Sequence, residues 1–124
     1  MQVLNTGDVT FHPDTTVTLN GGTITSGGPD LILHQWDNNA SGGLIINSQI
    51  TGIIAVTKTG SGALTLNNAN NSYSGNTYIG GQGAVTYGAT GAFGSGSVNM
   101  FSAAQLIIAP GTTLSNPVTL NNSY

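Results

Sequence analysis

The chain has almost no charged side chains. Of its 124 residues, one is Lys and four are Asp, and neither Glu nor Arg occurs. Soluble domains average about a quarter charged residues, so this chain must stay soluble through its hydroxyl and amide groups. Nucleic-acid binding requires clustered cations, and anionic membrane surfaces also attract basic segments. The formal net charge of −3 therefore argues against both nucleic acid and membranes as partners.

Cysteine is also absent. Its absence excludes a disulfide framework and a thiolate metal site, and it leaves the redox compartment open. No stretch approaches 18 consecutive apolar residues, so the sequence predicts no membrane insertion. The first residues carry no basic and then apolar leader, and we expect either that a signal was removed or that the chain is an excised piece. Its length predicts one domain spanning residues 1–124.

Short apolar segments recur at a nearly constant spacing. Each holds alternating apolar residues and is followed by Gly, Asn or Ser, which is the pattern of short strands ended by tight turns. Five such positions share one period, and they are Ile24, Leu44, Leu64, Val85 and Leu106. A second series advances at the same period and contains Ile79, Val98 and Val118. Two strand series with one period predict an all-β, single-domain parallel β-helix (β-solenoid) of about six coils with roughly 20 residues per coil.

Inward-facing side chains of successive coils stack on one another in a solenoid. We therefore expect the first series to form one apolar ladder, in which burial of each aliphatic side chain contributes about 1.5–3 kcal/mol. Asparagine is the other recurring residue, at Asn67, Asn68, Asn70 and Asn71 and again at Asn121 and Asn122. These amides are predicted to occupy corners and to hydrogen-bond along the stack, as amide ladders do in cross-β assemblies.

The segment 58–98 combines regularly spaced glycines with short apolar pairs. It begins KTGSGALTLNNANNSYSGNTYI and ends GATGAFGSGSV. This pattern resembles the autotransporter-associated β-strand repeat, although Phe93 stands where that repeat usually has Leu. The matching positions are Lys58, Thr59, Gly60, Gly62, Leu64, Leu66, Tyr73, Ser74, Gly75, Thr77, Ile79, Gly91, Gly94, Gly96 and Val98. The resemblance implies a right-handed parallel β-helix in a secreted bacterial passenger region, and it implies very little about the activity of that region.

Few side chains could carry acid–base chemistry. The densest ionisable group is His34 with Asp30 and Asp37. Glycoside cleavage needs two groups of separated pKa that flank the bond, and calcium needs six to eight oxygen ligands. We expect turn aspartates and a surface histidine here, with a catalytic or metal site as the alternative. The sequence therefore predicts no catalytic residue, no metal and no cofactor.

Aromatic residues leave a second function open. The candidates are Trp36, Tyr73, Tyr78, Tyr87 and Phe101. If several of these rings face outward on one side, they form a strip that can stack on carbohydrate rings. Otherwise they pack in the core or at coil edges. Thr-x-Thr pairs begin at Thr16, Thr23 and Thr57. Their separations do not fit the coil period, so the stacked Thr rows of ice-binding solenoids are not expected unless the structure aligns them.

We predict a non-enzymatic structural β-solenoid that belongs to a secreted or cell-surface protein. It would act as a fibre subunit, a stalk or an adhesive passenger, outside a bacterial cell. The alternative is a carbohydrate-binding or polysaccharide-degrading β-helix, with a glycan or cell-surface contact as partner. Neither end of the sequence shows helical periodicity or a charge cluster that would cap a coil. Low charge also leaves little repulsion between copies. The sequence therefore predicts self-association through open solenoid ends into filaments.

Overall fold

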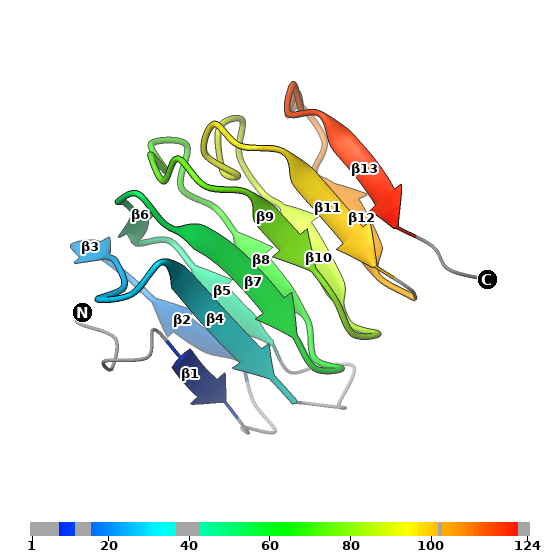
Figure 1. The fold of residues 1–124 in the computed structure, drawn as a ribbon, viewed down its shortest axis with the longest axis horizontal. Coiled ribbons are helices and arrows are strands. Elements are labelled where there is room, and N and C mark those ends of the chain that lie inside the picture. The colour runs from blue at the N-terminus through cyan, green and yellow to red at the C-terminus, as the bar shows by residue number, and fades with distance from the viewer. Residues whose placement is uncertain (1–7, 12–15, 37–42, 102, 122–124) are drawn as a thin grey trace.

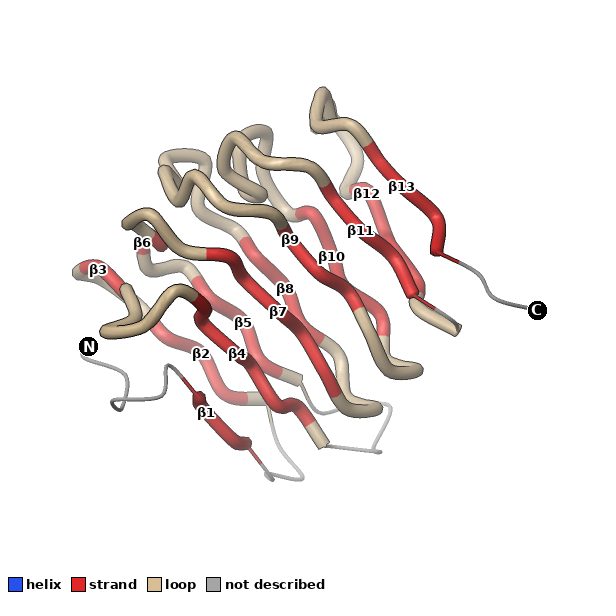
Figure 2. Tube along the Cα trace, viewed as in Figure 1, coloured by secondary structure: helices blue, strands red, loops and turns tan. Residues whose placement is uncertain are grey.

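The computed structural model describes residues 8–11, 16–36, 43–101 and 103–121. Every regular element within these ranges is a β-strand, and turns and loops join the strands at both ends (Figures 1 and 2). The strands are short because Gly, Asn and Ser follow each apolar pair, as the sequence pattern predicted. The all-β class is therefore confirmed.

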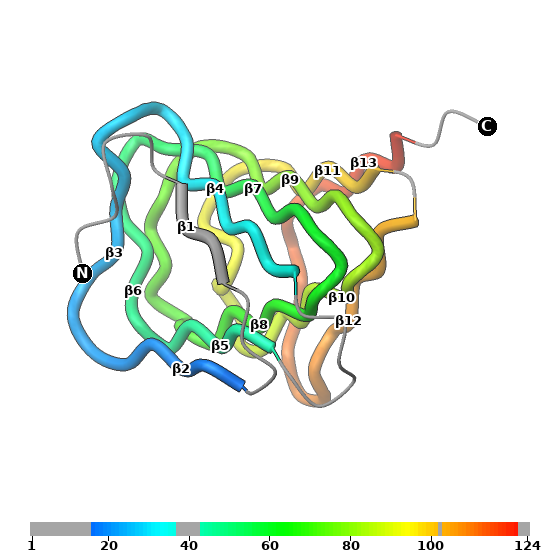
Figure 3. Tube along the Cα trace, turned by 90° about the horizontal axis from the view of Figure 1, so that it is seen from below, coloured from blue at the N-terminus to red at the C-terminus, as the bar shows by residue number. Residues whose placement is uncertain are grey.

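The strands form three parallel sheets. The six-stranded sheet has the order β1 (Asp8–Phe11), β4 (Asp30–Gln35), β7 (Ala55–Thr59), β9 (Thr77–Ile79), β11 (Val98–Phe101) and β13 (Val118–Asn121). The five-stranded sheet contains β2 (Val17–Leu19), β5 (Leu44–Ile46), β8 (Leu64–Leu66), β10 (Ala84–Tyr87) and β12 (Gln105–Ile108). The small sheet pairs β3 (Thr23–Ile24) with β6 (Gln49–Ile50). The two large sheets form opposite walls, and β3 and β6 lie at one side between them (Figure 3).

Each turn of the chain adds one strand to both large sheets. In the five-stranded sheet, Leu44 lies beside Leu64, Leu64 beside Val85 and Val85 beside Leu106. The fold is a β-solenoid of about four turns with roughly 21 residues per turn. The expected six coils were too many, because the whole length was divided by the period, whereas the five-stranded sheet extends only from Val17 to Ile108. The first turn, from Val17 to its register partner Leu44, is also longer than the others. The right-handed sense of the coil stays a prediction.

The predicted apolar ladder is correct from Leu44 onward and wrong at its first position. Val17 pairs with Leu44, whereas Ile24 pairs with Ile50 in the small sheet. The long first turn explains the error, since counting back by one ordinary period from Leu44 reaches the next strand of that turn. Both β2 and β3 carry apolar residues, so composition alone could not distinguish them.

The second series is also wrong at its first member. Val98 pairs with Val118 as predicted, but its other partner is Thr77, and Ile79 pairs with Met100. Thr77 is buried, and its hydroxyl group lies 2.7 Å from the hydroxyl oxygen of Tyr73. The inward register partner of Val98 is therefore a polar residue whose side chain is hydrogen-bonded, and not Ile79 as the apolar pattern predicted.

The core fills the space between the large sheets. Buried and partly exposed residues alternate along β4, β7 and β10, because successive side chains of a strand point to opposite faces. The buried apolar residues are Ile24, Leu31, Leu33, Leu44, Ile46, Ile50, Ile54, Val56, Leu64, Leu66, Tyr73, Ile79, Val85, Tyr87, Ala92, Phe93 and Val98. Leu106, expected in the same ladder, is only partly buried because β12 belongs to the last described coil.

Candidate functional site

Of the three ionisable residues that lie close together in the sequence, the structure places two, and these two stand apart. Asp30 and His34 both belong to β4, where alternation places them on the outward face, and four residues of extended strand separate them by about 13 Å. The Nδ1 atom of His34 hydrogen-bonds with Thr59 Oγ1 in the next coil. Asp37 lies outside the described residues. No group of three His, Cys, Asp or Glu that could hold a metal occurs within the described ranges.

The single cation of the chain lies inside the solenoid. The side chain of Lys58 is 1% exposed, and its Nζ donates hydrogen bonds to the carbonyl oxygens of Gly60 at 2.7 Å and Gly83 at 3.2 Å. Burial lowers the pKa of Lys58 to about 8. Lys58 therefore ties two successive corners together and offers no surface charge to a ligand. Sequence analysis assigned Lys58 only to the repeat motif, although its alternation with Val56 was a signal for an inward position.

Glycines occupy corners where the backbones of adjacent coils touch. A Cβ atom at Gly81 would lie 2.2 Å from the carbonyl oxygen of Gly60, and one at Gly83 would lie 2.0 Å from that of Gly62. Real Cβ contacts are essentially never shorter than 3.0 Å. These positions therefore exclude every side chain. The same holds for five glycines of the repeat-like pattern, where a Cβ would lie 2.1–2.5 Å from a backbone oxygen of the adjacent coil: Gly60, Gly75, Gly91, Gly94 and Gly96.

Asparagine side chains form the predicted amide ladder. Asn47 Nδ2 donates to Asn20 Oδ1 at 2.7 Å, and Asn67 Nδ2 donates to Asn47 Oδ1 at 3.1 Å. Stacking at a corner is confirmed for Asn67, which bonds with Asn47, and Asn47 bonds in turn with Asn20. Neither Asn20 nor Asn47 belongs to the cluster noted in the sequence. The ladder stops at Gly88, since a Cβ there would lie 1.8 Å from Asn67 Oδ1.

A buried amide joins further coils. Asn71 Oδ1 accepts a hydrogen bond from the backbone N–H of Ile50 at 2.7 Å, and Asn71 Nδ2 donates to the carbonyl oxygen of Ala92 at 2.8 Å. Each partner is 21 residues away, so this one side chain connects its own coil to the coil on either side. Asn71 therefore has a structural role. Asn122 of the predicted set lies outside the described residues.

The aromatic residues divide between the core and the surface. Tyr73 and Tyr87 are buried, and burial raises the pKa of Tyr73 well above its usual range. Trp36 and Phe101 remain 50% and 44% exposed, and Tyr78 is partly exposed. The ring centroids of Tyr78 and Phe101 are 6.3 Å apart, with their planes inclined by 30°. Two of the five aromatics therefore cannot belong to a surface strip.

Threonine pairs do not align into rows. Thr57 lies between Ile32 and Tyr78 in register, and Thr18 lies beside Ile45. As expected from their spacing, these pairs therefore do not form the surface array of an ice-binding solenoid.

The last described coil presents apolar side chains at the end of the stack. Alternation and register place Ile108, Val118 and Leu120 inward, yet they are 42%, 44% and 72% exposed. Strands β12 and β13 each have a partner on one side only among the described strands. At the other end, Val17 and Leu19 of β2 are partly buried. An open apolar face, defined here as Leu106, Ile108, Val118 and Leu120, therefore lies at the β12–β13 end.

Comparison with known proteins identifies a relative. The chain is 35% identical over 106 residues to the adhesin BmaC autotransporter of Brucella suis biovar 1 (strain 1330). The aligned region covers 86% of this chain and 3% of that protein. No family model matches the chain, and no solved structure matches it. The described residues contain no helix with the length and apolarity needed to cross a membrane.

Proposed function

We propose that this chain is a non-enzymatic, rigid β-solenoid module of a bacterial cell-surface or secreted protein, acting as a stalk or adhesive passenger segment. The observation that carries the proposal is the stack of coils joined by glycine corners, Lys58 and asparagine amides. The 35% identity to an autotransporter adhesin and the resemblance of residues 58–98 to the autotransporter-associated β-strand repeat support the surface location.

Geometry favours a structural role over catalysis. Each coil adds about 4.8 Å to the stack, so the length of the module grows with the number of its coils. Asp30 is the one carboxylate whose side chain the structure describes, and His34 stands about 13 Å from it along the same strand. A polysaccharide-cleaving pair needs two carboxyl groups within about 5–9.5 Å, and the described side chains supply no such pair.

Surface display on a non-adherent bacterium tests this function. We expect the chain, placed between a membrane anchor and a terminal epitope, to hold the epitope accessible to antibody or to increase retention on cultured cells. The matched control is Leu64→Asp, which destroys the core and should lose both effects. An epitope that is equally accessible in both versions, together with unchanged retention, would contradict the proposal. Polysaccharide cleavage that Asp30→Asn or His34→Ala abolishes would refute its non-enzymatic part.

We further propose that the open apolar face receives the first coil of a second copy, so that the purified chain associates end to end. A parallel strand added beside β13 would continue the ladder of the six-stranded sheet and cover Leu120, which is 72% exposed. Because head-to-tail contacts of this kind do not close, the product is a filament. The low charge of the chain opposes such an approach only weakly.

Light scattering and electron microscopy across a concentration series test the association. Leu120→Lys should keep the protein monomeric, because it places a charge in the contact. Ile53→Lys is the matched control, since Ile53 is 91% exposed in the loop between β6 and β7, away from the last coil. The wild-type protein and this control are expected to form filaments. A monodisperse wild-type monomer at every concentration would overturn the association and leave the stalk role standing.

A further inference from the structure

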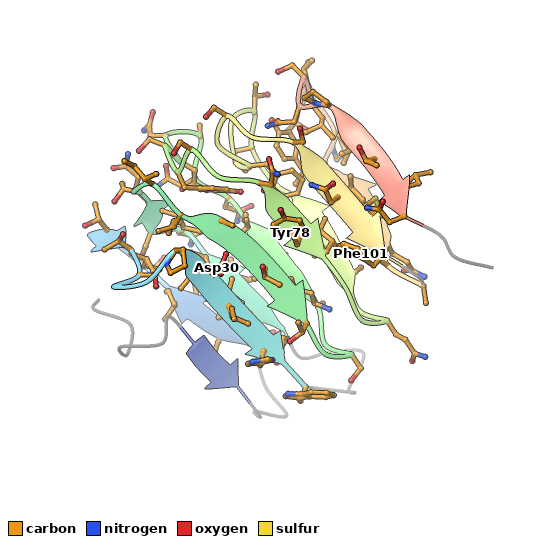
Figure 4. All side chains as sticks on the ribbon, in the orientation of Figure 1. Asp30, Tyr78 and Phe101 are labelled. Carbon is orange, nitrogen blue, oxygen red and sulfur yellow. The ribbon has the colours of Figure 1, made fainter. Side chains whose placement is uncertain are left out.

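Two aromatic rings lie on the outward face of the six-stranded sheet. Tyr78 of β9 and Phe101 of β11 come from paired strands, as Figure 4 shows. Their neighbours Ile79 and Met100 are register partners on the inward face, so alternation directs Tyr78 and Phe101 outward. With centroids 6.3 Å apart and planes inclined by 30°, the two rings form one continuous apolar area.

A missing side chain leaves space beside these rings. Because Ile79 pairs with Met100, the following residues Gly80 and Phe101 also lie side by side. A Cβ at Gly80 would meet only the carbonyl oxygen of Lys58, at 3.6 Å, which is an ordinary contact. Gly80 therefore differs from the corner glycines, since a side chain would fit there. Its absence leaves a gap in the outward row between Thr59 and Phe101.

Hydrogen-bonding groups border the aromatic area. Asn76 Nδ2 donates to the hydroxyl oxygen of Tyr78 at 3.3 Å, and Asn76 Oδ1 accepts from the backbone N–H of Ser97 at 3.1 Å. These two bonds fix the polar end of the Tyr78 ring. On the other side of Gly80, the hydroxyl of Thr59 is hydrogen-bonded with the His34 ring. The rings are thus framed by amide and hydroxyl groups whose positions the sheet holds.

The charge of this area selects among partners. No outward residue of β7, β9 or β11 carries a charge at neutral pH, so an anionic partner would lose its hydration without gaining a counter-ion. A protein partner needs about 800 Å² of surface from each side, more than two rings provide. A neutral pyranose has an apolar C–H face and a rim of hydroxyl groups, which match the rings and their polar border.

We propose that Tyr78 and Phe101, with Gly80 between their strands, form a binding site for neutral oligosaccharides. One sugar ring lies with its C–H face on the aromatic area and fills the gap at Gly80. Its hydroxyl groups hydrogen-bond with the bordering amide and hydroxyl groups. This site goes beyond the stalk role and does not depend on it. It is also independent of the end-to-end association, because it lies on the side of the solenoid and not at its end.

Isothermal titration calorimetry with cellohexaose, maltohexaose and chitohexaose tests the site. We expect at least one of these probes to bind with a Kd of about 1 mM or tighter, the range reached by a few small contacts. Phe101→Ala should weaken that binding by about tenfold, since it removes one ring contact. Gly80→Val should weaken it similarly by filling the gap, while Tyr78→Phe keeps the ring and should retain most of the affinity.

Ile107→Ala is the matched control. Ile107 is 49% exposed and lies on the outward face of the five-stranded sheet, so its removal should leave the Kd unchanged. Thermal melting of every variant shows whether the fold is kept. The proposal is overturned if none of the three probes binds at about 10 mM, a concentration that detects even weak sites. It is also overturned if folded Phe101→Ala or Gly80→Val binds as the wild type does.

Discussion

Replacing one corner glycine by alanine should destabilise the whole stack. In Gly83→Ala, the new Cβ would lie 2.0 Å from the carbonyl oxygen of Gly62 and 2.6 Å from that of Ser61. Ordinary contact begins at 3.4 Å, so the adjacent corners must move apart locally. Both contacted atoms belong to the backbone, and no flexible side chain can relieve the contact. The same movement disturbs the hydrogen bond from Lys58 Nζ to the Gly83 carbonyl oxygen, which measures 3.2 Å.

The expected cost follows from these two effects. Forcing extra volume into a packed site costs about 1–3 kcal/mol, and weakening a hydrogen bond to a charged group costs about 1.5–3 kcal/mol. We therefore expect the free energy of unfolding to fall by about 2.5–6 kcal/mol, against a total of about 5–15 kcal/mol for a domain. For a chain of this size each kcal/mol lowers Tm by about 3–6 °C, so Tm should fall by at least about 7 °C.

Three other glycines provide matched controls for steric contact and backbone conformation. Gly27 has open space around it and no positive φ, and Gly21 has open space with a φ of 72°. Gly81 combines a φ of 80° with a Cβ contact of 2.2 Å. Alanine at Gly27 should be nearly neutral, and at Gly21 it should cost about 1–2 kcal/mol because of the left-handed backbone. Alanine at Gly81 should cost at least as much as at Gly83.

Urea and thermal unfolding followed by circular dichroism measure the series. The predicted order of stability is Gly27→Ala, then Gly21→Ala, then Gly83→Ala and Gly81→Ala. If Gly83→Ala unfolds at the same temperature as Gly27→Ala, the coils do not touch at that corner, and the reasoning is refuted.

Further predictions concern the core, the loop amides and pH. Leu64→Asp should prevent folding, because an unpaired buried carboxylate costs several kcal/mol. Leu106→Asp changes a partly buried site and should only lower Tm. Equal melting curves of the two variants by circular dichroism would contradict the assigned core. Asn68→Ala loses two side-chain hydrogen bonds to backbone groups. The free energy of unfolding, measured in urea, should fall by about 1–2 kcal/mol. An unchanged urea midpoint would count against these bonds. The pKa of Lys58 is about 8 in the folded chain, below its ordinary value of 10.5. Between these two values the unfolded chain binds more protons than the folded chain. The free energy of unfolding should therefore rise from pH 8 toward pH 10. Lys58→Met should remove that rise, and a wild-type profile that falls in this window would contradict it. Burial raises the pKa of Tyr73, so stability should decrease above about pH 10, where the unfolded chain ionises first; in Tyr73→Phe this decrease should be smaller.

The solenoid could be predicted from the sequence because its two main constraints are local. Tight turns need Gly and Asn, and inward strand positions need apolar residues, so both recur with the coil period. Leu44, Leu64 and Val85 are therefore register partners as expected. The prediction failed where the coil changes length. The first turn is longer and carries β3, so Ile24 belongs to a different sheet.

The surface could be predicted only in part. Alternation from Ile79 and Val85 was sufficient to place Tyr78 outward and Tyr87 inward, a signal that the sequence analysis did not use. The ring contact between Tyr78 and Phe101 was not accessible, because it depends on the register between β9 and β11, in which Tyr78 lies beside Asn99, and not on spacing along the chain. Alternation with Val56 indicated an inward position for Lys58, but its hydrogen-bond partners could not be predicted. Both acceptors are backbone carbonyl groups, one of them 25 residues away, and backbone groups leave no trace in composition.

Disulfide trapping tests the coil register most directly, because the chain contains no cysteine. Thr65 and Thr86 are partners in β8 and β10, so their Cα atoms lie about 4.8 Å apart, within the range that a disulfide bridges. Ile107, the partner of Thr86 in β12, lies two strands from Thr65, at about 9.6 Å. Under mild oxidation of dilute protein, Thr65→Cys with Thr86→Cys should form an intramolecular disulfide, and Thr65→Cys with Ile107→Cys should not. A first pair that stays reduced, or that links only between molecules, would contradict the stacked solenoid.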